Sequence, residues 1–213
     1  MMQFSPDHTL TIGFPDMMMQ GPCPSFLTIM QLIPEAAERI TSRRLKRPPE
    51  DVQQLAQGEV DLIFTDLGQK ELENHSFSKR KLFDDKAHVC MRRDHPLSRH
   101  ASLTLEQLQN ETIRRYDDMT FFLARVEPRL EALGIRMKDE SHLTFVQLLP
   151  QVVMNGGVII SNQRPVDHPD LVYIPLRLDP PIDIGIAWRR ANCPPLLKRL
   201  IQLLTALPDD TWR

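Results

Sequence analysis

The feature that most constrains the fold is an alternation of short β-branched or apolar segments with longer segments of helical periodicity. Between residues 10 and 65 the order is strand, helix, strand, helix, strand, and the same order recurs between residues 112 and 160. Such alternation favours α/β layers in which helices connect neighbouring parallel strands. The sequence therefore predicts two doubly wound, Rossmann-like lobes with mostly parallel sheets.

The helical segments are recognised by apolar residues that recur at intervals of three and four. Pro48 and Pro49 suit a helix start, since proline lacks the N–H that has no partner there, and Gly58 suits a helix end. We expect helices at 26–33, 50–57, 105–109, 122–133, 145–153 and 195–204, and strands at 10–14, 40–45, 60–65, 78–83, 87–91, 112–116, 136–140, 158–160, 171–174 and 183–188.

Charge and cysteine content exclude several classes of protein. The chain has 26 Lys and Arg against 28 Asp and Glu, so it lacks the strongly basic balance of a domain that grips nucleic acid by itself. Its three cysteines lie far apart and fit neither a disulfide framework nor a zinc motif. No segment reaches the roughly 18 apolar residues that span a bilayer, and no export signal is visible, so a cytoplasmic protein with reduced thiols is expected.

Enzymatic motifs are missing from the sequence. Adjacent carboxylates such as Asp84 and Asp85 point to opposite faces of a strand and do not form an acid/base pair by adjacency. Gly156 and Gly157 follow a helix and precede a strand, the reverse of a phosphate-binding loop. No serine lies in a Gly-x-Ser-x-Gly elbow. We therefore expect no enzyme, no metal site and no cofactor.

Five short motifs, in register along the chain, resemble the regulatory domain of LysR-type transcriptional regulators. The most specific is VCMRRDHPL at residues 89–97. The others are LAQGEVDLIF at 55–64, SLTLEQL at 102–108, NGGVIIS at 155–161 and IAWRR at 186–190.

This resemblance implies a type II periplasmic-binding-protein-like fold with an interlobe cleft. Lobe I is expected to comprise residues 9–110 and 181–213, and lobe II residues 111–180. The winged helix-turn-helix of a full-length regulator is not visible in this sequence, so DNA is expected as a partner only through that absent domain. The domain would sense a small effector, with a carboxylate or aromatic acid expected, in order to modulate transcription.

The resemblance also places the effector-binding residues, which follow strand ends or begin a helix. They are Pro15, Asp16, Met17, Thr65, Asp66, Tyr116, Asp117, His142, Leu143, Ser161 and Asn162. The aspartates are equally well explained as turn or cap residues, and His142 as a capping or solvated histidine. Pro15 stands where many members carry a small hydroxyl residue, and the adjacent methionines indicate a more apolar ligand or simply core packing.

An antiparallel homodimer, forming a tetramer in the full-length regulator, is a further implication of the resemblance. The segments 26–37 and 40–45 of one chain would pack against 121–133 and 136–140 of the other, although Phe26, Ile29 and Met30 could instead serve the core. The interface residues expected are Phe26, Ile29, Met30, Ile33, Val126 and Leu130. Two other functions stay open: a free-standing solute-binding protein of the same fold, and a transferase built on it.

Overall fold

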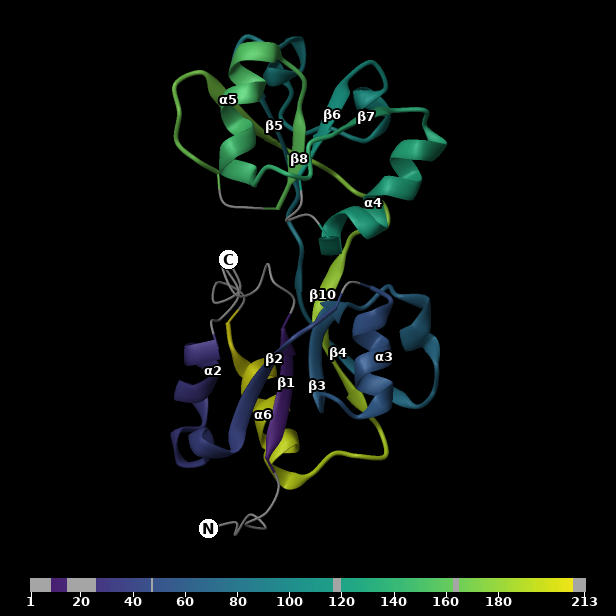
Figure 1. Cartoon of the computed structure of the whole chain (residues 1–213), viewed down its shortest axis with the longest axis vertical. Coiled ribbons are helices and arrows are strands. Elements are labelled where there is room, and N and C mark those ends of the chain that lie inside the picture. The colour runs from purple at the N-terminus through teal and green to yellow at the C-terminus, as the bar shows by residue number, and fades with distance from the viewer. Residues whose placement is uncertain (1–8, 15–25, 47, 117–119, 163–164, 209–213) are drawn as a thin grey trace. The chain divides into compact units, whose positions relative to one another are not determined.

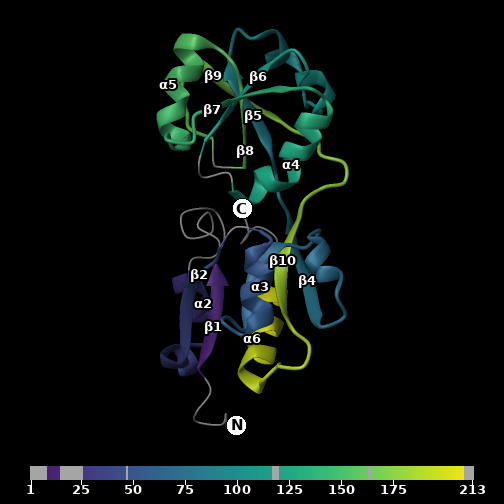
Figure 2. The ribbon, with the colours of Figure 1, turned by 45° about the vertical axis from the view of Figure 1, so that its right-hand side comes forward.

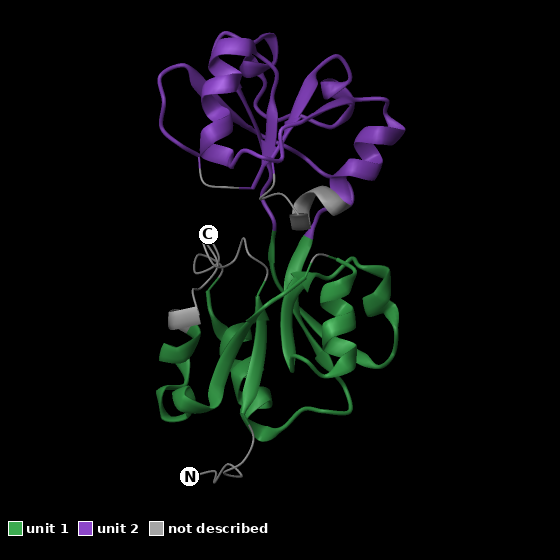
Figure 3. Cartoon of the chain, viewed as in Figure 1, with its two compact units in different colours: residues 1–84, 183–213 green, residues 85–182 purple. Residues whose placement is uncertain are grey.

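The computed structural model describes residues 9–14, 26–46, 48–116, 120–162 and 165–208; at 26–28 and 120–124 only the backbone is described. The chain divides into two compact units, which Figure 3 shows in different colours. Unit 1 comprises residues 1–84 and 183–213, and unit 2 comprises residues 85–182. The order of the helices and strands can be followed in Figure 1.

Unit 1 is built on one five-stranded sheet in the order β2-β1-β3-β10-β4. Its strands are β1 (Leu10–Phe14), β2 (Ile40–Arg44), β3 (Leu62–Asp66), β4 (Phe77–Asp84) and β10 (Asp183–Arg189), and its helices are α2 (Phe26–Leu32), α3 (Glu50–Gln57) and α6 (Pro195–Ala206), with 3-10 helices at Pro34–Arg39 and Lys70–Glu73. Strand β1 runs parallel to β2 and β3, whereas β10 is antiparallel to both β3 and β4. The expectation of a mostly parallel sheet is therefore wrong for this half of the sheet.

Helices cover both faces of this sheet, as the views in Figures 1 and 2 show. The crossover from β1 to β2 and the crossover from β2 to β3 run in opposite directions along the sheet. Because such crossovers are right-handed, α2 and α3 lie on opposite faces. Helix α6 packs against α2 and therefore shares its face.

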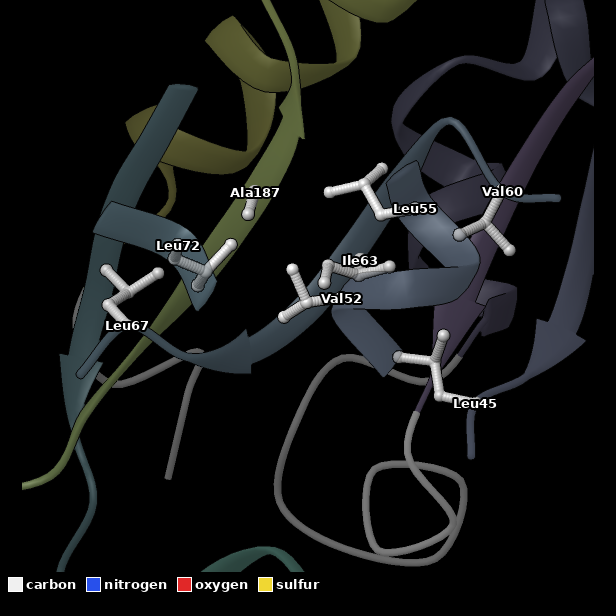
Figure 4. Close-up of a cluster of buried hydrophobic side chains, with 8 residues drawn as sticks. All are labelled: Leu45, Val52, Leu55, Val60, Ile63, Leu67, Leu72 and Ala187. Atoms are coloured by element: carbon white, nitrogen blue, oxygen red, sulfur yellow. The ribbon is translucent and has the colours of Figure 1, made fainter. Parts of the chain in front are cut away.

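The core beneath α3 holds the end of β3 in place. Val52 and Leu55 of α3 pack against Ile63 of β3 and Ala187 of β10, together with Leu45, Val60, Leu67 and Leu72 (Figure 4). All eight side chains are at most 8% exposed. Burial of this kind is worth about 25 cal/mol per Å² of apolar surface removed from water, so it fixes the β3–α3 pair as a rigid support.

Unit 2 contains β5 (His88–Arg92), β6 (Thr112–Arg115), α4 (Thr120–Ala132), β7 (Arg136–Asp139), α5 (Phe145–Asn155), β8 (Ile159–Ser161) and β9 (Leu171–Pro175), with 3-10 helices at Pro96–Arg99 and Glu106–Leu108. One sheet has the order β8-β5-β9 with antiparallel pairs, and a second pairs β6 with β7 in parallel. A parallel bridge from Ile113 to Val158 connects the two, reinforced by the amide of Arg114, which donates to the carbonyl of Val158 at 2.8 Å.

The expected boundary between the lobes, at residues 110 and 111, is corrected by these pairings. Strand β5 is hydrogen-bonded to β8 and β9, and Leu103 pairs with Leu176. Residues 85–110 thus belong to unit 2 and not to the first lobe. Strand partners far apart in the sequence are set by backbone hydrogen bonds, which hydrophobic periodicity does not encode.

Burial also corrects the expected dimer residues. Ile29, Ile33, Val126 and Leu130 are each 0% exposed within their own chain, so these side chains are core residues and not a free surface. Met30 is half-buried, and the side chain of Phe26 lies outside the described residues. The alternative that the apolar residues serve the core is therefore correct for Ile29, and the expected interface role is wrong for Ile33, Val126 and Leu130.

Candidate functional site

The structure describes seven of the eleven residues expected to bind an effector. Pro15, Asp16, Met17 and Asp117 lie outside the described residues. Of the others, Thr65 and Asp66 belong to unit 1, whereas Tyr116, His142, Leu143, Ser161 and Asn162 belong to unit 2.

In unit 2, the structure brings Tyr116 and Ser161 together. Tyr116 directly follows β6 and Ser161 is the last residue of β8, and their hydroxyl oxygens lie 2.7 Å apart. The ring of Phe145, the first residue of α5, lies 5.6 Å from the ring of Tyr116. Two hydroxyl-bearing strand ends and the start of a helix therefore meet at one edge of unit 2, which we call the β6–β8 edge.

The β6–β8 edge continues through Asn162 to a residue that the sequence did not single out. The side-chain amide of Asn162 donates to the carboxylate of Asp85 at 3.0 Å. The backbone amide of Asp85 in turn donates to the carbonyl of Ile182 at 2.9 Å. We considered Asp85 in the sequence only beside its neighbour Asp84, and no spacing there links it to Asn162, which lies 77 positions away.

His142 and Leu143 lie in the turn before α5, where His142 is exposed. The helix is capped instead by Thr144, whose hydroxyl accepts the amide of Gln147, while the Gln147 side chain accepts the amide of Thr144 in a capping box. His142 is therefore not the cap. The first turn of an eleven-residue helix combines N–H groups that lack partners within the helix with the positive end of its dipole.

In unit 1, the hydroxyl of Thr65 is committed to a buried network. It donates to Asp51 of α3 at 2.7 Å and accepts from the side-chain amide of Gln69 at 2.6 Å, and that amide also donates to Asp51 at 2.9 Å. Burial raises the pKa of Asp51, which outweighs the opposing effect of these hydrogen bonds. The network fixes the end of β3 to α3, and the sequence did not reveal Asp51 or Gln69 as its members.

Asp66 adopts the turn role that was the alternative to ligand binding. Its carboxylate accepts the backbone amide of Gly68 at 2.8 Å, and the residue is 1% exposed. Such a bond two residues along the chain is the usual Asx turn. A direct role for Thr65 and Asp66 in binding stays a prediction.

A buried ion pair connects β6, which forms part of the β6–β8 edge, to the neighbouring β7 and α5. The guanidinium of Arg114 in β6 donates to both carboxylate oxygens of Glu140, at 2.9 and 2.8 Å, and to the carbonyl of Gly156 at 2.7 Å. Burial alone would raise the pKa of Glu140, but Lys138 and Arg114 outweigh it and the pKa is lowered. The charge pair thus connects β6, the end of β7 and the end of α5.

Within the described ranges, no group of three or more His, Cys, Asp or Glu side chains is placed to hold a metal ion. Nor does any helix there have the length and apolar content needed to cross a membrane.

Comparison with protein families decides what this architecture is. Residues 5–208 match the family model of the LysR substrate binding domain. The chain belongs to that family. The resemblance inferred from the five sequence motifs is therefore confirmed, and the domain is an effector-binding regulatory domain of LysR type, a family of regulator domains and not of catalysts. No curated protein matches the chain by sequence.

Solved structures of LysR-type regulators share the fold. The effector-binding domain of BenM with its effector benzoate has a TM-score of 0.71 and 18% identity, covering 96% of this chain and 97% of that one. The reduced regulatory domain of OxyR from Pseudomonas aeruginosa has a TM-score of 0.66 and 19% identity, covering 94% and 98%. Full-length CbnR complexed with its target DNA has a TM-score of 0.63 and 13% identity, covering 92% and 69%. At these identities the likeness confirms the type II periplasmic-binding-protein fold.

Proposed function

We propose that this LysR substrate-binding domain senses a small carboxylate, with an aromatic acid as the preferred class, and that the β6–β8 edge of unit 2 holds it. In a full-length regulator, ligand binding would alter transcription through a DNA-binding domain outside this chain. The observation that carries the proposal is the meeting of Tyr116, Ser161 and the first turn of α5.

The chemistry of that edge suits a carboxylate attached to a ring. Hydroxyl groups donate to carboxylate oxygens, and the N-terminus of α5 offers further N–H donors and a favourable dipole. The aromatic ring of Phe145, which is 4% exposed, packs beside those hydroxyl groups, and aromatic rings favour offset or edge contacts with one another. The fold is shared with the effector-binding domain of BenM, whose structure with its effector benzoate is consistent with this class of ligand.

Burial explains why this edge would be a precise site. Tyr116 is 1% exposed and Ser161 is 0% exposed, and the Arg114–Glu140 pair holds β6, the strand that Tyr116 directly follows. Side chains fixed in this way lose little conformational entropy when a ligand binds, which favours affinity. A ligand changes the conformation of a regulator only by binding one conformation more tightly than another, and donors that are held rigidly make that difference larger.

A ligand screen monitored by thermal unfolding tests the proposal. Benzoate and a panel of small aliphatic and aromatic acids should raise the melting temperature of the wild-type domain. The Ser161→Ala variant should lose most of that shift because it lacks one donor. Exposed Ser42 on β2 provides a matched control, since Ser42→Ala changes the same atoms outside the proposed site. If the acids raised the melting temperatures of Ser161→Ala and Ser42→Ala equally, the placement of the site at the β6–β8 edge would be wrong.

His142 extends the same experiment. As an exposed imidazole in the turn before α5, it would face an acid bound at the helix start. We expect His142→Ala to reduce the shift given by acids and to leave the shift given by the corresponding amides unchanged, because only the acids carry a charge. A variant that reduces both shifts equally would contradict an electrostatic role for His142.

We also propose that the domain forms a homodimer, as the resemblance implies, through surfaces other than the four buried side chains named above. Half-buried Met30 on α2 remains a candidate contact. Sedimentation velocity at tens of micromolar should show a dimer that Met30→Asp weakens. A wild-type domain that sediments as a monomer throughout would contradict this proposal.

A further inference from the structure

Unit 2 contains a pocket that is separate from the Tyr116–Ser161 pair. Its volume is about 400 Å³, which falls within the range of roughly 300–1,000 Å³ typical of small-molecule sites. All of its lining residues belong to unit 2. It has one residue, Asp85, in common with the β6–β8 edge.

The wall of the pocket is mainly apolar. Ala87 and Leu176 contribute from the adjoining strand ends, and Leu178, Pro181 and Ile182 from the segment before β10. Leu176 and Ile182 are at most 7% exposed, so they form a fixed wall, whereas Leu178 is half-buried. A rigid wall of this composition favours a compact apolar ligand, because it gains contacts without losing side-chain freedom.

Two aromatic side chains supply the polar part of the wall. The rings of His88 and Tyr173 meet edge to face, with centroids 5.1 Å apart and planes at 77°. The hydroxyl of Tyr173 accepts the amide of Val166 at 3.1 Å. The Nε2 atom of His88 is buried and has no hydrogen-bond partner among the described residues. A buried polar atom without a partner is unfavourable, and a ligand group that formed a hydrogen bond with it would relieve that cost.

The charges around the pocket disfavour an ionic ligand. Burial lowers the pKa of His88 to about 4, so its imidazole is neutral at neutral pH. The neighbouring residues Asp85 and Lys86 carry opposite charges, and the Asp85 carboxylate is already bonded to Asn162. Because these two charges oppose each other, neither an anion nor a cation gains a net attraction, and either ion would lose hydration against the apolar wall, whereas a neutral molecule would not.

We propose that this pocket is a second ligand site, for a small uncharged molecule that has one ring and one hydrogen-bonding group directed at His88. The site is independent of the acid-binding site proposed above. Ring compounds of the size of a phenol fit the volume, and their hydroxyl group matches the single unsatisfied nitrogen.

The position of the pocket in the chain gives the site a regulatory use. Asp85 is the first residue of unit 2 and Ile182 is the last, so both connections to unit 1 begin at the pocket wall. The two residues are joined by a backbone hydrogen bond of 2.9 Å. A ligand in contact with both would restrain the two connections together, and would thereby couple to any ligand that changes them.

Titration of 4-fluorophenol, followed by ¹⁹F NMR, tests the second site. Binding to the wild-type domain is expected in the micromolar to low millimolar range, and Leu178→Trp, which fills the pocket from a half-buried position, should weaken it at least tenfold. Met154→Trp is the matched control, because Met154 is 76% exposed near the end of α5 and lies outside the lining. His88→Phe keeps a ring but removes the nitrogen and should weaken binding severalfold.

Charged analogues and hydrogen exchange complete the test. We expect 4-fluorobenzoate and 4-fluorobenzylamine to bind the pocket at least tenfold more weakly, and 4-fluorophenol to slow exchange of the Asp85 amide. Absence of wild-type binding, or equal binding by Leu178→Trp with its fold intact by circular dichroism, overturns the site. Loss of 4-fluorophenol binding in Ser161→Ala would show that the probe binds at the β6–β8 edge, and this result would also overturn the proposed pocket site. If Leu178→Trp does not fold, His88→Phe decides by the same comparison.

Discussion

The hydroxyl oxygens of Tyr116 and Ser161 lie 2.7 Å apart, although the two residues are separated by 45 positions in the chain. Each stands at the carboxyl end of a strand, which is where open α/β sheets bind their ligands.

Removing either hydroxyl should destabilise unit 2 through loss of a buried hydrogen bond. Tyr116→Phe and Ser161→Ala should each lower the free energy of unfolding by about 1–2 kcal/mol. The double variant should lose less than the sum, because the second substitution removes a group already deprived of this bond. Urea unfolding of the four proteins measures the coupling, and strictly additive losses would show that the bond contributes nothing of its own.

The Arg114–Glu140 pair should matter more than an exposed ion pair of equal length. Glu140→Ala leaves a buried guanidinium without its carboxylate, so a loss of about 3–5 kcal/mol is expected. The Arg199–Glu35 pair has the same distance of 2.8 Å, but its side chains are 47% and 45% exposed. Glu35→Ala should cost under about 1 kcal/mol. Similar losses in both variants would show that burial does not decide the strength of these pairs.

His88 should make the domain less stable in mild acid. Below pH 6.5 the unfolded imidazole takes up a proton, whereas the folded one, with a pKa of about 4, stays neutral. Stability contributed by the neutral form is therefore present above pH 6.5 and is lost as the pH falls towards 4, by up to about 3 kcal/mol.

Chemical denaturation between pH 7 and pH 4 measures this loss. In the His88→Phe variant, the free energy of unfolding should change less with pH than it does in the wild type. His142→Ala, which changes an exposed histidine, serves as the control and should retain the wild-type slope. If the free energy of unfolding of His88→Phe changed with pH as steeply as that of the wild type, the lowered pKa of His88 would be refuted.

Gly185 should tolerate no side chain, because β4 lies too close. A Cβ placed there would lie 2.2 Å from the backbone carbonyl oxygen of Arg80, which cannot move without breaking the β10–β4 pairing. Gly185→Ala should therefore cost about 3 kcal/mol or more. At Gly134 a Cβ meets nothing within 4 Å and only the positive φ opposes it, so Gly134→Ala should cost about 1–2 kcal/mol. Melting temperatures of both variants test the ranking.

Most secondary structure could be predicted from local pattern. The strand Leu10–Phe14 was placed with its observed bounds, and the end of α3 at Gly58 followed from the glycine. Boundaries elsewhere shifted by one or two residues, as at β8, which begins at Ile159. The 3-10 helices at Pro34–Arg39, Lys70–Glu73 and Pro96–Arg99 were missed because such short turns carry no sustained periodicity.

The candidate site was predictable in part. Tyr116, Ser161 and Asn162 were named from the resemblance to the family, and the structure places them at one edge, although their role in binding stays a prediction. Asp85, Phe145 and the His88–Tyr173 wall were not named, since their neighbours come from distant segments. Asp66 has the turn role that was one of its two interpretations, whereas the hydrogen bond between Thr65 and Gln69 is a structural role that the strand-end position did not indicate.

The sequence by itself determined the alternation of strands and helices, the residues at the strand ends and the family. These depend on local propensity, apolar periodicity and short motifs, all of which are written along the chain. Tertiary structure alone decided the antiparallel entry of β10, the assignment of residues 85–110 to unit 2 and the burial of Ile29 and Val126. These depend on which distant backbone groups pair and which apolar faces meet, and only the folded chain brings those groups together.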